Sequence, residues 1–225
     1  MGANAVTTVP VYVAGEVLTA ADLNITNSGI PVFATTTTRD AAFGGTGEKT
    51  LAEGQFAYLE DTNTTQYYDG AAWVSVAPAR QIAIFNETQA SNTNGGTATA
   101  GSYVKRVLNT TIQNNITGCS IASSVITLAA GTYALTARAP HFDVTTNSSR
   151  LQNTTDATTT QQGSSNFCNN SNMSFTFINA YFTITGTKNF ELQTRVGATV
   201  ATNGYGTATA FGPEIYSFVS IERFA

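Results

Sequence analysis

The stretch GGTGEKT, residues 44–50, is the part of the sequence that most resembles a phosphate-binding loop. In such a loop a lysine directly follows the last glycine, so that backbone amides and the lysine surround the phosphates together. Here Glu48 separates Gly47 from Lys49, and its negative charge would face the phosphate oxygens. The spacing therefore argues against a nucleotide site, and we interpret the glycines as a flexible turn.

His141 is the only histidine, and Asp143 follows it two residues later. On a strand both side chains would point to the same side, an arrangement suited to general-base chemistry. No nucleophile-elbow motif accompanies them, and the 14 acidic residues form no evident pair for glycoside cleavage. Cys119 and Cys168 stand alone, without metal-site spacing. We therefore predict no enzyme, no metal site and no cofactor, and we interpret His141 as a loop or interface residue.

The composition predicts a surface made of hydroxyl and amide groups. Only 11% of the residues are charged and the net charge is −4, with no cluster of lysine or arginine, so nucleic acid is not an expected partner. No apolar run approaches about 18 residues and no basic, then apolar leader is present, so we expect neither membrane insertion nor ordinary secretion. Without a secretory signal we favour free thiols over a Cys119–Cys168 disulfide.

Turn residues and shifts in composition divide the chain into three parts. Residues 1–30 are predicted to form an extended arm with one helical turn from Thr19 to Asn24, and they contain too few large apolar residues to fold alone. Residues 31–78 are predicted to form a small β-meander module, and residues 79–225 a larger β domain. We expect the arm to dock on another surface.

The module combines a short helix with three strands. TRDAAFGG predicts a helix that Thr38 caps and Gly44 ends, and QFAYLE, TQYYDG and AWVSV predict strands joined by turn residues. We expect the small core to come from four aromatic residues, namely Trp73, Tyr58, Tyr67 and Phe56. Three short strands are marginal in isolation, so support from neighbouring copies is expected.

The larger domain alternates in the manner of half-buried strands. KNFELQT places Phe190 and Leu192 on one face, and TYALTAR places Tyr133, Leu135 and Ala137 on one face. Further strands are predicted at QIAIFNE, YVKRVLN, SVITLAA, SSRLQNTT, SFTFINAYFTI and EIYSFVSIERF. Eight or nine strands with no long helix predict an all-β fold, a β-sandwich or jelly roll.

Two of these strands are apolar on both faces. In EIYSFVSIERF, Ile215, Val219 and Ile221 lie on one face and large aromatic residues lie on the other. SFTFINAYFTI likewise carries large apolar residues on both faces. Because one face of a sandwich strand ordinarily meets water, the second apolar face needs a cover, which we expect to be another subunit rather than a loop of the same chain. The predicted interface residues are Tyr216, Phe218, Phe224, Phe175, Phe177 and Tyr181.

Longer stretches carry a resemblance to known proteins. VYVAGEVLTAADLN, PVFATTTTRDAAFGGTGEKTLAEGQFAYLED and QYYDGAAWVSV resemble the N-terminal module of tailed-bacteriophage tail or fibre proteins. LAAGTYALTARAPHF, RLQNTTDATTT, FTITGTKNFELQTRV and TNGYGTATAFGPEIYSFVSIE are similar to phage proteins whose head resembles the trimeric jelly roll of tumour necrosis factor and the complement globular head. Together the two matches cover nearly the whole chain.

The resemblance implies a homotrimeric virion appendage, assembled in the bacterial cytoplasm and exposed on the virion surface. Its N-terminal part would fasten to another virion protein of the tail or capsid, through Val11, Tyr12, Val13, Leu18 and Leu23. The jelly roll would face outward as a knob.

Two functions remain open for such a protein. In the first, exposed loops bind host-surface polysaccharide, where amides and aromatic rings in GATVATNGYGTATAFG suit sugars and the trimer adds multivalency. The candidate binding residues are Asn203, Tyr205, Phe211, His141 and Asp143; they would equally serve to build turns and the interior. In the second, the protein is a decoration or connector protein that stabilises the particle and recognises no receptor.

Overall fold

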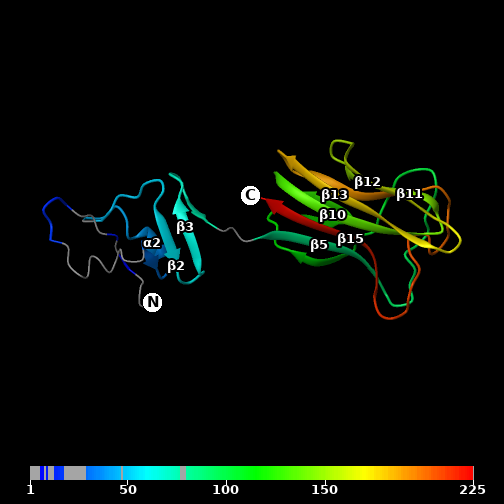
Figure 1. Cartoon of the computed structure of the whole chain (residues 1–225), viewed down its shortest axis with the longest axis horizontal. Helices are drawn as coiled ribbons and strands as arrows, with labels where there is room; N and C mark the ends of the chain where they lie inside the picture. The colour runs from blue at the N-terminus through cyan, green and yellow to red at the C-terminus, as the bar shows by residue number, and fades with distance from the viewer. Residues whose placement is uncertain are drawn as a thin grey trace. The chain divides into compact units, whose positions relative to one another are not determined.

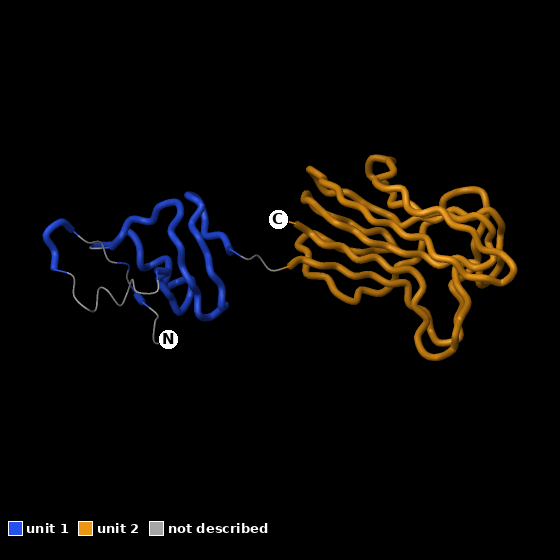
Figure 2. The backbone as a smooth tube through the Cα atoms, viewed as in Figure 1, with its two compact units in different colours: residues 1–79 blue, residues 80–225 orange. Residues whose placement is uncertain are grey.

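The computed structural model describes residues 6–7, 9, 13–17, 29–46, 48–76 and 80–224. The chain divides into two compact units, residues 1–79 (unit 1) and residues 80–225 (unit 2), shown in Figure 2. Most of the regular secondary structure in both units is β-strand, and the described residues contain a single short helix (Figure 1). The predicted all-β fold class is therefore confirmed.

Unit 1 contains a four-stranded sheet in the order β1-β2-β3-β4. The meander β2 (Phe56–Leu59), β3 (Thr64–Tyr68) and β4 (Trp73–Ser75) falls on the three predicted strands. A two-residue strand that was not predicted, β1 (Val32–Phe33), pairs in parallel with β2. Two residues give too short a pattern to identify a strand from sequence.

Helix α2 (Thr36–Asp40) starts earlier than predicted. Its N-cap is Thr35, whose Oγ1 accepts a hydrogen bond from the Thr38 amide, while Thr38 Oγ1 accepts one from the Thr35 amide at 3.0 Å. Thr38 is thus the third helical residue of a capping box, not the cap. The helix ends at Asp40, with Ala41 as C-cap, so Gly44 lies beyond its end.

The core of unit 1 lies on the opposite face of β2 from the predicted one. Ala57 and Leu59 are buried with Val9, Phe33 and Ala42. The prediction followed the largest side chains, but strand alternation sends those of β2 outward once Ala57 and Leu59 face the helix. Of the four predicted core residues only Trp73 packs against this cluster; the three others are partly or well exposed, namely Tyr58, Tyr67 and Phe56.

The glycine-rich stretch of unit 1 is held by its neighbours. The Gly44 amide donates to the Lys49 carbonyl at 3.1 Å, and the Lys49 amide donates to the Val9 carbonyl at 3.0 Å. The Glu48 carboxylate accepts a hydrogen bond from the Gly45 amide at 2.8 Å. The stretch therefore packs against the N-terminal segment, and Val9 of the predicted arm contributes to the core of unit 1 itself.

Unit 2 is a sandwich of two antiparallel sheets. The first has the order β13-β10-β15-β5-β7, from strands β13 (Met173–Ile184), β10 (Gly131–Phe142), β15 (Glu214–Phe224), β5 (Gln81–Gln89) and β7 (Thr110–Asn114). The second has the order β12-β11-β14-β9-β8, from β12 (Thr158–Cys168), β11 (Thr145–Asn153), β14 (Lys188–Val196), β9 (Val125–Leu128) and β8 (Ser120–Ala122). The short strand β6 (Val104–Lys105) also pairs with β14.

The chain crosses repeatedly between the two sheets, which makes unit 2 a jelly roll. It passes from β9 to β10, from β10 to β11, from β12 to β13, from β13 to β14 and from β14 to β15, and each of these steps changes sheet. The predicted inward residues are buried between the sheets; they are Tyr133, Leu135, Ala137, Phe190 and Leu192. The jelly-roll prediction is confirmed by this strand order.

Candidate functional site

The outer face of the first sheet of unit 2 carries a row of aromatic side chains, which we call the apolar face. It comprises Phe175, Phe177 and Tyr181 of β13 with Phe218 and Phe224 of β15. Their strand neighbours Ile178 and Val219 are buried in the core, so alternation turns these rings outward. Exposure reaches 50% for Phe177 and 71% for Tyr181.

Strand β10 lies between β13 and β15 and carries Arg138 in the middle of the apolar face. Arg138 is opposite Phe177 on one side and Phe218 on the other. Its guanidinium carbon lies 5.7 Å from the centroid of the Phe175 ring. Tyr181 and Phe224 contact across the sheet, with ring centroids 5.7 Å apart. The apolar face therefore spans three strands in two aromatic groups, with the polar side chains of Asn179, Thr136 and Ser220 between them.

Tyr216, the sixth predicted interface residue, lies inside the chain instead. The register of β15 against β5 shifts between Ile215 and Phe218, and this irregularity reverses the alternation. Tyr216 is consequently buried, and its hydroxyl donates to the Thr93 carbonyl at 2.7 Å. Ile215, which the sequence pattern places on the face opposite the predicted interface residues, is 51% exposed.

Two of the predicted ligand-binding residues are buried in a polar network at one end of the sandwich. The His141 ring is fully buried and Tyr205 nearly so. The guanidinium carbon of Arg106 lies 3.8 Å from the Tyr205 ring centroid, and Arg106 forms an ion pair with Glu87 at 2.9 Å. Ser217 joins both charged groups by hydrogen bonds. His141 and Tyr205 therefore serve the interior, and their prediction as surface binding residues was wrong.

Burial also removes His141 from acid–base chemistry. Desolvation, together with the nearby positive charge of Arg106, lowers the pKa of His141 to about 3. Its Nε2 lies 3.1 Å from the Thr176 hydroxyl. Asp143 lies beyond the end of β10 with a φ of 57°, so the strand geometry that would place it beside His141 does not apply.

The other candidates of the notably polar C-terminal loop remain near the surface. Asn203 is half-buried and donates to the Thr207 hydroxyl at 3.4 Å, whereas Phe211 is 96% exposed. In the N-terminal part, Val13 is 68% exposed. The remaining predicted attachment residues lie outside the described residues; they are Val11, Tyr12, Leu18 and Leu23.

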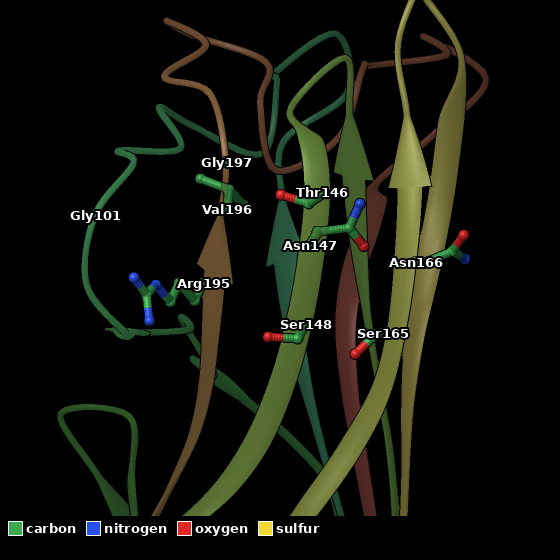
Figure 3. Close-up of a pocket in the computed structure, with 9 residues that line it drawn as sticks. All are labelled: Gly101, Thr146, Asn147, Ser148, Ser165, Asn166, Arg195, Val196 and Gly197. Atoms are coloured by element: carbon green, nitrogen blue, oxygen red, sulfur yellow. The ribbon is translucent and has the colours of Figure 1, made fainter.

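A polar pocket of about 490 Å³ lies on the second sheet of unit 2. Strands β11, β12 and β14 supply most of its lining, and Gly101 belongs to a loop beside β14 (Figure 3). In that view the hydroxyls of Thr146 and Ser148 and the side chain of Arg195 extend to one side of the strands. The lining residues are Gly101, Thr146, Asn147, Ser148, Ser165, Asn166, Arg195, Val196 and Gly197.

Strand register assembles this pocket from residues that are far apart in the sequence. Ser148 is opposite Arg195 of β14 on one side and Ser165 of β12 on the other. Sequence analysis did not identify these residues. The only available signal is the alternation within TTNSSRLQN, which places Thr146 and Ser148 on one face of β11.

The chemistry of metals and thiols is limited in the described part of the chain. No three His, Cys, Asp or Glu side chains gather there as metal ligands, and no described helix is long and apolar enough to span a membrane. Cys119 and Cys168 are free, and burial raises the pKa of the Cys119 thiol to about 11. At neutral pH this thiol is therefore protonated and poorly nucleophilic.

No protein-family model matches the sequence, and the curated proteins contain no match. Three of the solved structures with a similar arrangement are murine APRIL at pH 8.0 (11% identity, TM-score 0.43, 64% of this chain and 99% of that chain), the globular domain of zebrafish complement 1qA (12%, 0.38, 64% and 94%) and the Eiger TNF of S. frugiperda (13%, 0.42, 65% and 93%). The jelly-roll assignment follows from the strand order of unit 2 itself, and these similarities carry no statement about function.

Proposed function

We propose that this protein is a non-enzymatic, homotrimeric appendage on the particle surface of a tailed bacteriophage. Unit 1 fastens it to another virion protein, and unit 2 is a knob that binds host-surface polysaccharide. The sequence resemblance is the basis for the phage assignment, for the threefold symmetry and for the orientation, with unit 1 toward the particle and unit 2 outward. The structural observation that supports the proposal is the apolar face of unit 2.

An exposed row of aromatic side chains on a sheet is costly in water, because each ring leaves a large apolar area hydrated. Phe177, Tyr181 and Phe224 are each more than 40% exposed, and no described segment of the chain covers them. Burying such rings against another copy contributes up to about 1.5–3 kcal/mol per side chain. The same patch on every subunit suits a closed, symmetric assembly.

Self-association is tested with Phe177→Asp/Tyr181→Asp, which places two charges on the apolar face. We expect the wild-type protein to be a trimer by light scattering coupled to size exclusion, and the variant to be a monomer with an unchanged circular dichroism spectrum. Phe167→Asp is the matched control, because Phe167 is 55% exposed on β12 of the other sheet. A wild-type protein that is monomeric at micromolar concentrations would refute the trimer.

Binding to the host is tested with the purified trimer. It is expected to bind host cells and to compete with phage adsorption, while Phe177→Asp/Tyr181→Asp loses apparent affinity because it loses multivalency. If the trimer forms but neither binds cells nor competes, receptor recognition is absent.

The second candidate function is that of a decoration or connector protein without receptor recognition. The outer face of the unit 1 sheet favours it, because Phe56 is 43% exposed there and its ring centroid lies 6.3 Å from that of Tyr67. A second exposed aromatic face suits additional contact with the particle. This role predicts particles that are weakened by loss of the protein while adsorption is unchanged.

A further inference from the structure

The two outer faces of the unit 2 sandwich differ in chemistry. On the first sheet the apolar face presents aromatic rings. On the second sheet, a row across three strands joins Arg195, Ser148 and Ser165. These three residues line the polar pocket, whose volume of about 490 Å³ lies within the range of small-molecule binding sites. This part of the second face therefore presents hydroxyl groups and one guanidinium, next to the exposed ring of Phe167.

Arg195 brings a positive charge to this pocket that no acidic side chain neutralises. It is exposed, and the ion pairs of the described residues do not include it. Glu191, two residues earlier on β14, is occupied by Lys105 at 3.6 Å and by the Gln193 amide at 2.7 Å. The guanidinium of Arg195 is therefore available to an anion from outside the chain.

A second arginine adds to the positive field beside the pocket. Arg150 Nε donates to the Gln193 side chain at 2.9 Å, and the Arg150 guanidinium carbon lies 4.0 Å from the Tyr103 ring centroid. Tyr103 contacts Ser148 of the pocket, with 3.3 Å between the hydroxyl oxygens. Burial raises the pKa of Tyr103, but hydrogen bonds from Ser148 and Gln162 and the charges of both arginines outweigh it and lower the pKa. In a chain of net charge −4, this is a local basic site.

We infer that the pocket binds a carboxylate-bearing sugar, with Arg195 paired to the carboxylate and the hydroxyls of Thr146, Ser148 and Ser165 bonded to the sugar hydroxyls. The planar guanidinium matches a carboxylate with two parallel hydrogen bonds. A single free guanidinium balances one negative charge, and the three uncharged hydroxyls suit a ring rich in hydroxyl groups. The inference rests on the proposed binding role of unit 2 and adds to it the place and the chemical class of the ligand.

The test uses the full-length protein and a panel of oligosaccharides that contain uronic or sialic acids, each paired with its carboxyl-reduced form. We expect at least one acidic member to bind about tenfold or more tightly than its reduced partner, with an affinity that weakens as salt increases. Arg195→Ala should reduce that affinity about tenfold or more, and Arg195→Lys should restore part of it. Lys49→Ala is the matched control, because it removes one exposed positive charge from unit 1.

Host-cell binding by the same proteins separates the two proposals. If wild-type protein and Arg195→Ala bind cells equally well, or if no acidic sugar is preferred over its reduced form, the pocket inference fails while the binding role of unit 2 stands. If the wild-type trimer binds neither cells nor any sugar, both the binding role of unit 2 and the pocket inference are refuted. Loss of both cell binding and acidic-sugar binding in Arg195→Ala, with the trimer intact, supports the inference.

Discussion

At the scale of single residues, the interior of unit 2 depends on one buried ion pair. The side chains of Arg106 and Glu87 are each only 1% exposed. The free energy lost by removing two charges from water offsets most of the free energy gained from their attraction, so the pair adds little net stability. Removing only one partner is costly, because the other charge then stays buried without compensation. Ser217 bridges them, and the Tyr205 ring lies against the guanidinium. The polar network thus fixes β5, β15 and the loop that contains Tyr205 in one arrangement.

The first prediction concerns this pair. Arg106→Met leaves the buried Glu87 without a positively charged partner and should lower the free energy of unfolding by about 3–5 kcal/mol. The double variant Arg106→Met/Glu87→Leu should cost less than the two single changes combined. Urea denaturation followed by fluorescence measures both. The control is Arg80→Ala, which breaks the exposed pair with Glu222 and should cost far less, because water screens an exposed ion pair. Equal costs for the buried and exposed pairs would contradict the prediction.

The second prediction concerns His141 and pH. The pKa of His141 is about 3 in the folded chain, below the ordinary value of 6.5, so the unfolded chain binds the proton more tightly. The stabilising contribution of neutral His141 is therefore complete above pH 6.5 and is lost as pH falls toward 3. Between pH 7 and pH 5 this loss amounts to about 2 kcal/mol.

His141→Gln tests that prediction, because glutamine retains a hydrogen-bonding group near Thr176 and does not titrate. Its unfolding free energy should fall less than that of the wild-type protein between pH 7 and pH 5, by about the 2 kcal/mol assigned to His141. Parallel pH dependences for the two proteins would show that His141 does not carry this effect.

At the scale of elements, β12 and β13 meet at the edge of the two sheets without sharing a ladder. The Phe177 amide of β13 donates to the Ser164 hydroxyl at 2.8 Å, and the Asn166 amide group donates to the Phe175 carbonyl at 3.1 Å. An open strand edge offers unpaired groups to other chains. Side chains of β12 cover the edge of β13 and satisfy part of its backbone.

The third prediction follows from this covered edge. Ser164→Ala/Asn166→Ala should speed hydrogen exchange at the Phe177 amide and increase aggregation on mild heating, because the edge of β13 becomes available to other chains. Ser165→Ala is the control, since its exposed hydroxyl is directed away from β13 toward the pocket lining. Exchange at Phe177 that is unchanged in the double variant would show that the side chains of Ser164 and Asn166 do not protect this edge.

The elements also show how far sequence patterns extend. Strands β10 and β14 were predicted because one face alternates with the other in residues such as Tyr133 and Leu192. Strand β12 was missed because TTTQQGSSNF carries polar side chains on both faces, one toward solvent and one toward the edge of β13. The register shift between Ile215 and Phe218 could not be predicted for a different reason, because it depends on how β15 pairs with β5.

At the scale of the whole molecule, the apolar face could be predicted from the sequence, whereas the pocket could not. Within β13 and within β15 the exposed aromatic residues are separated by even numbers of positions, so the sequence alone places those of each strand on one face. Ser148, Ser165 and Arg195 meet only through the register of three strands. Polar residues at such separations carry no local pattern, and only the fold brings them together.

The two units also have separate cores, which leads to the fourth prediction. Among the described residues, five buried apolar side chains form the core of unit 1, whereas 17 form the main cluster of unit 2, and no residue belongs to both. A core of five side chains gives marginal stability. We therefore expect two thermal transitions in the full-length protein, the lower from unit 1 and the upper from unit 2.

Calorimetry of three proteins tests this independence. Residues 80–225 alone should fold and retain only the upper transition. In the full-length chain, Phe33→Ala should abolish or lower only the first transition, and Leu151→Ala should lower only the second, because each removes a fully buried side chain worth about 2–5 kcal/mol from one core. If Phe33→Ala shifts both transitions, or if residues 80–225 fail to fold alone, the units stabilise each other and unit 1 is more than an attachment module.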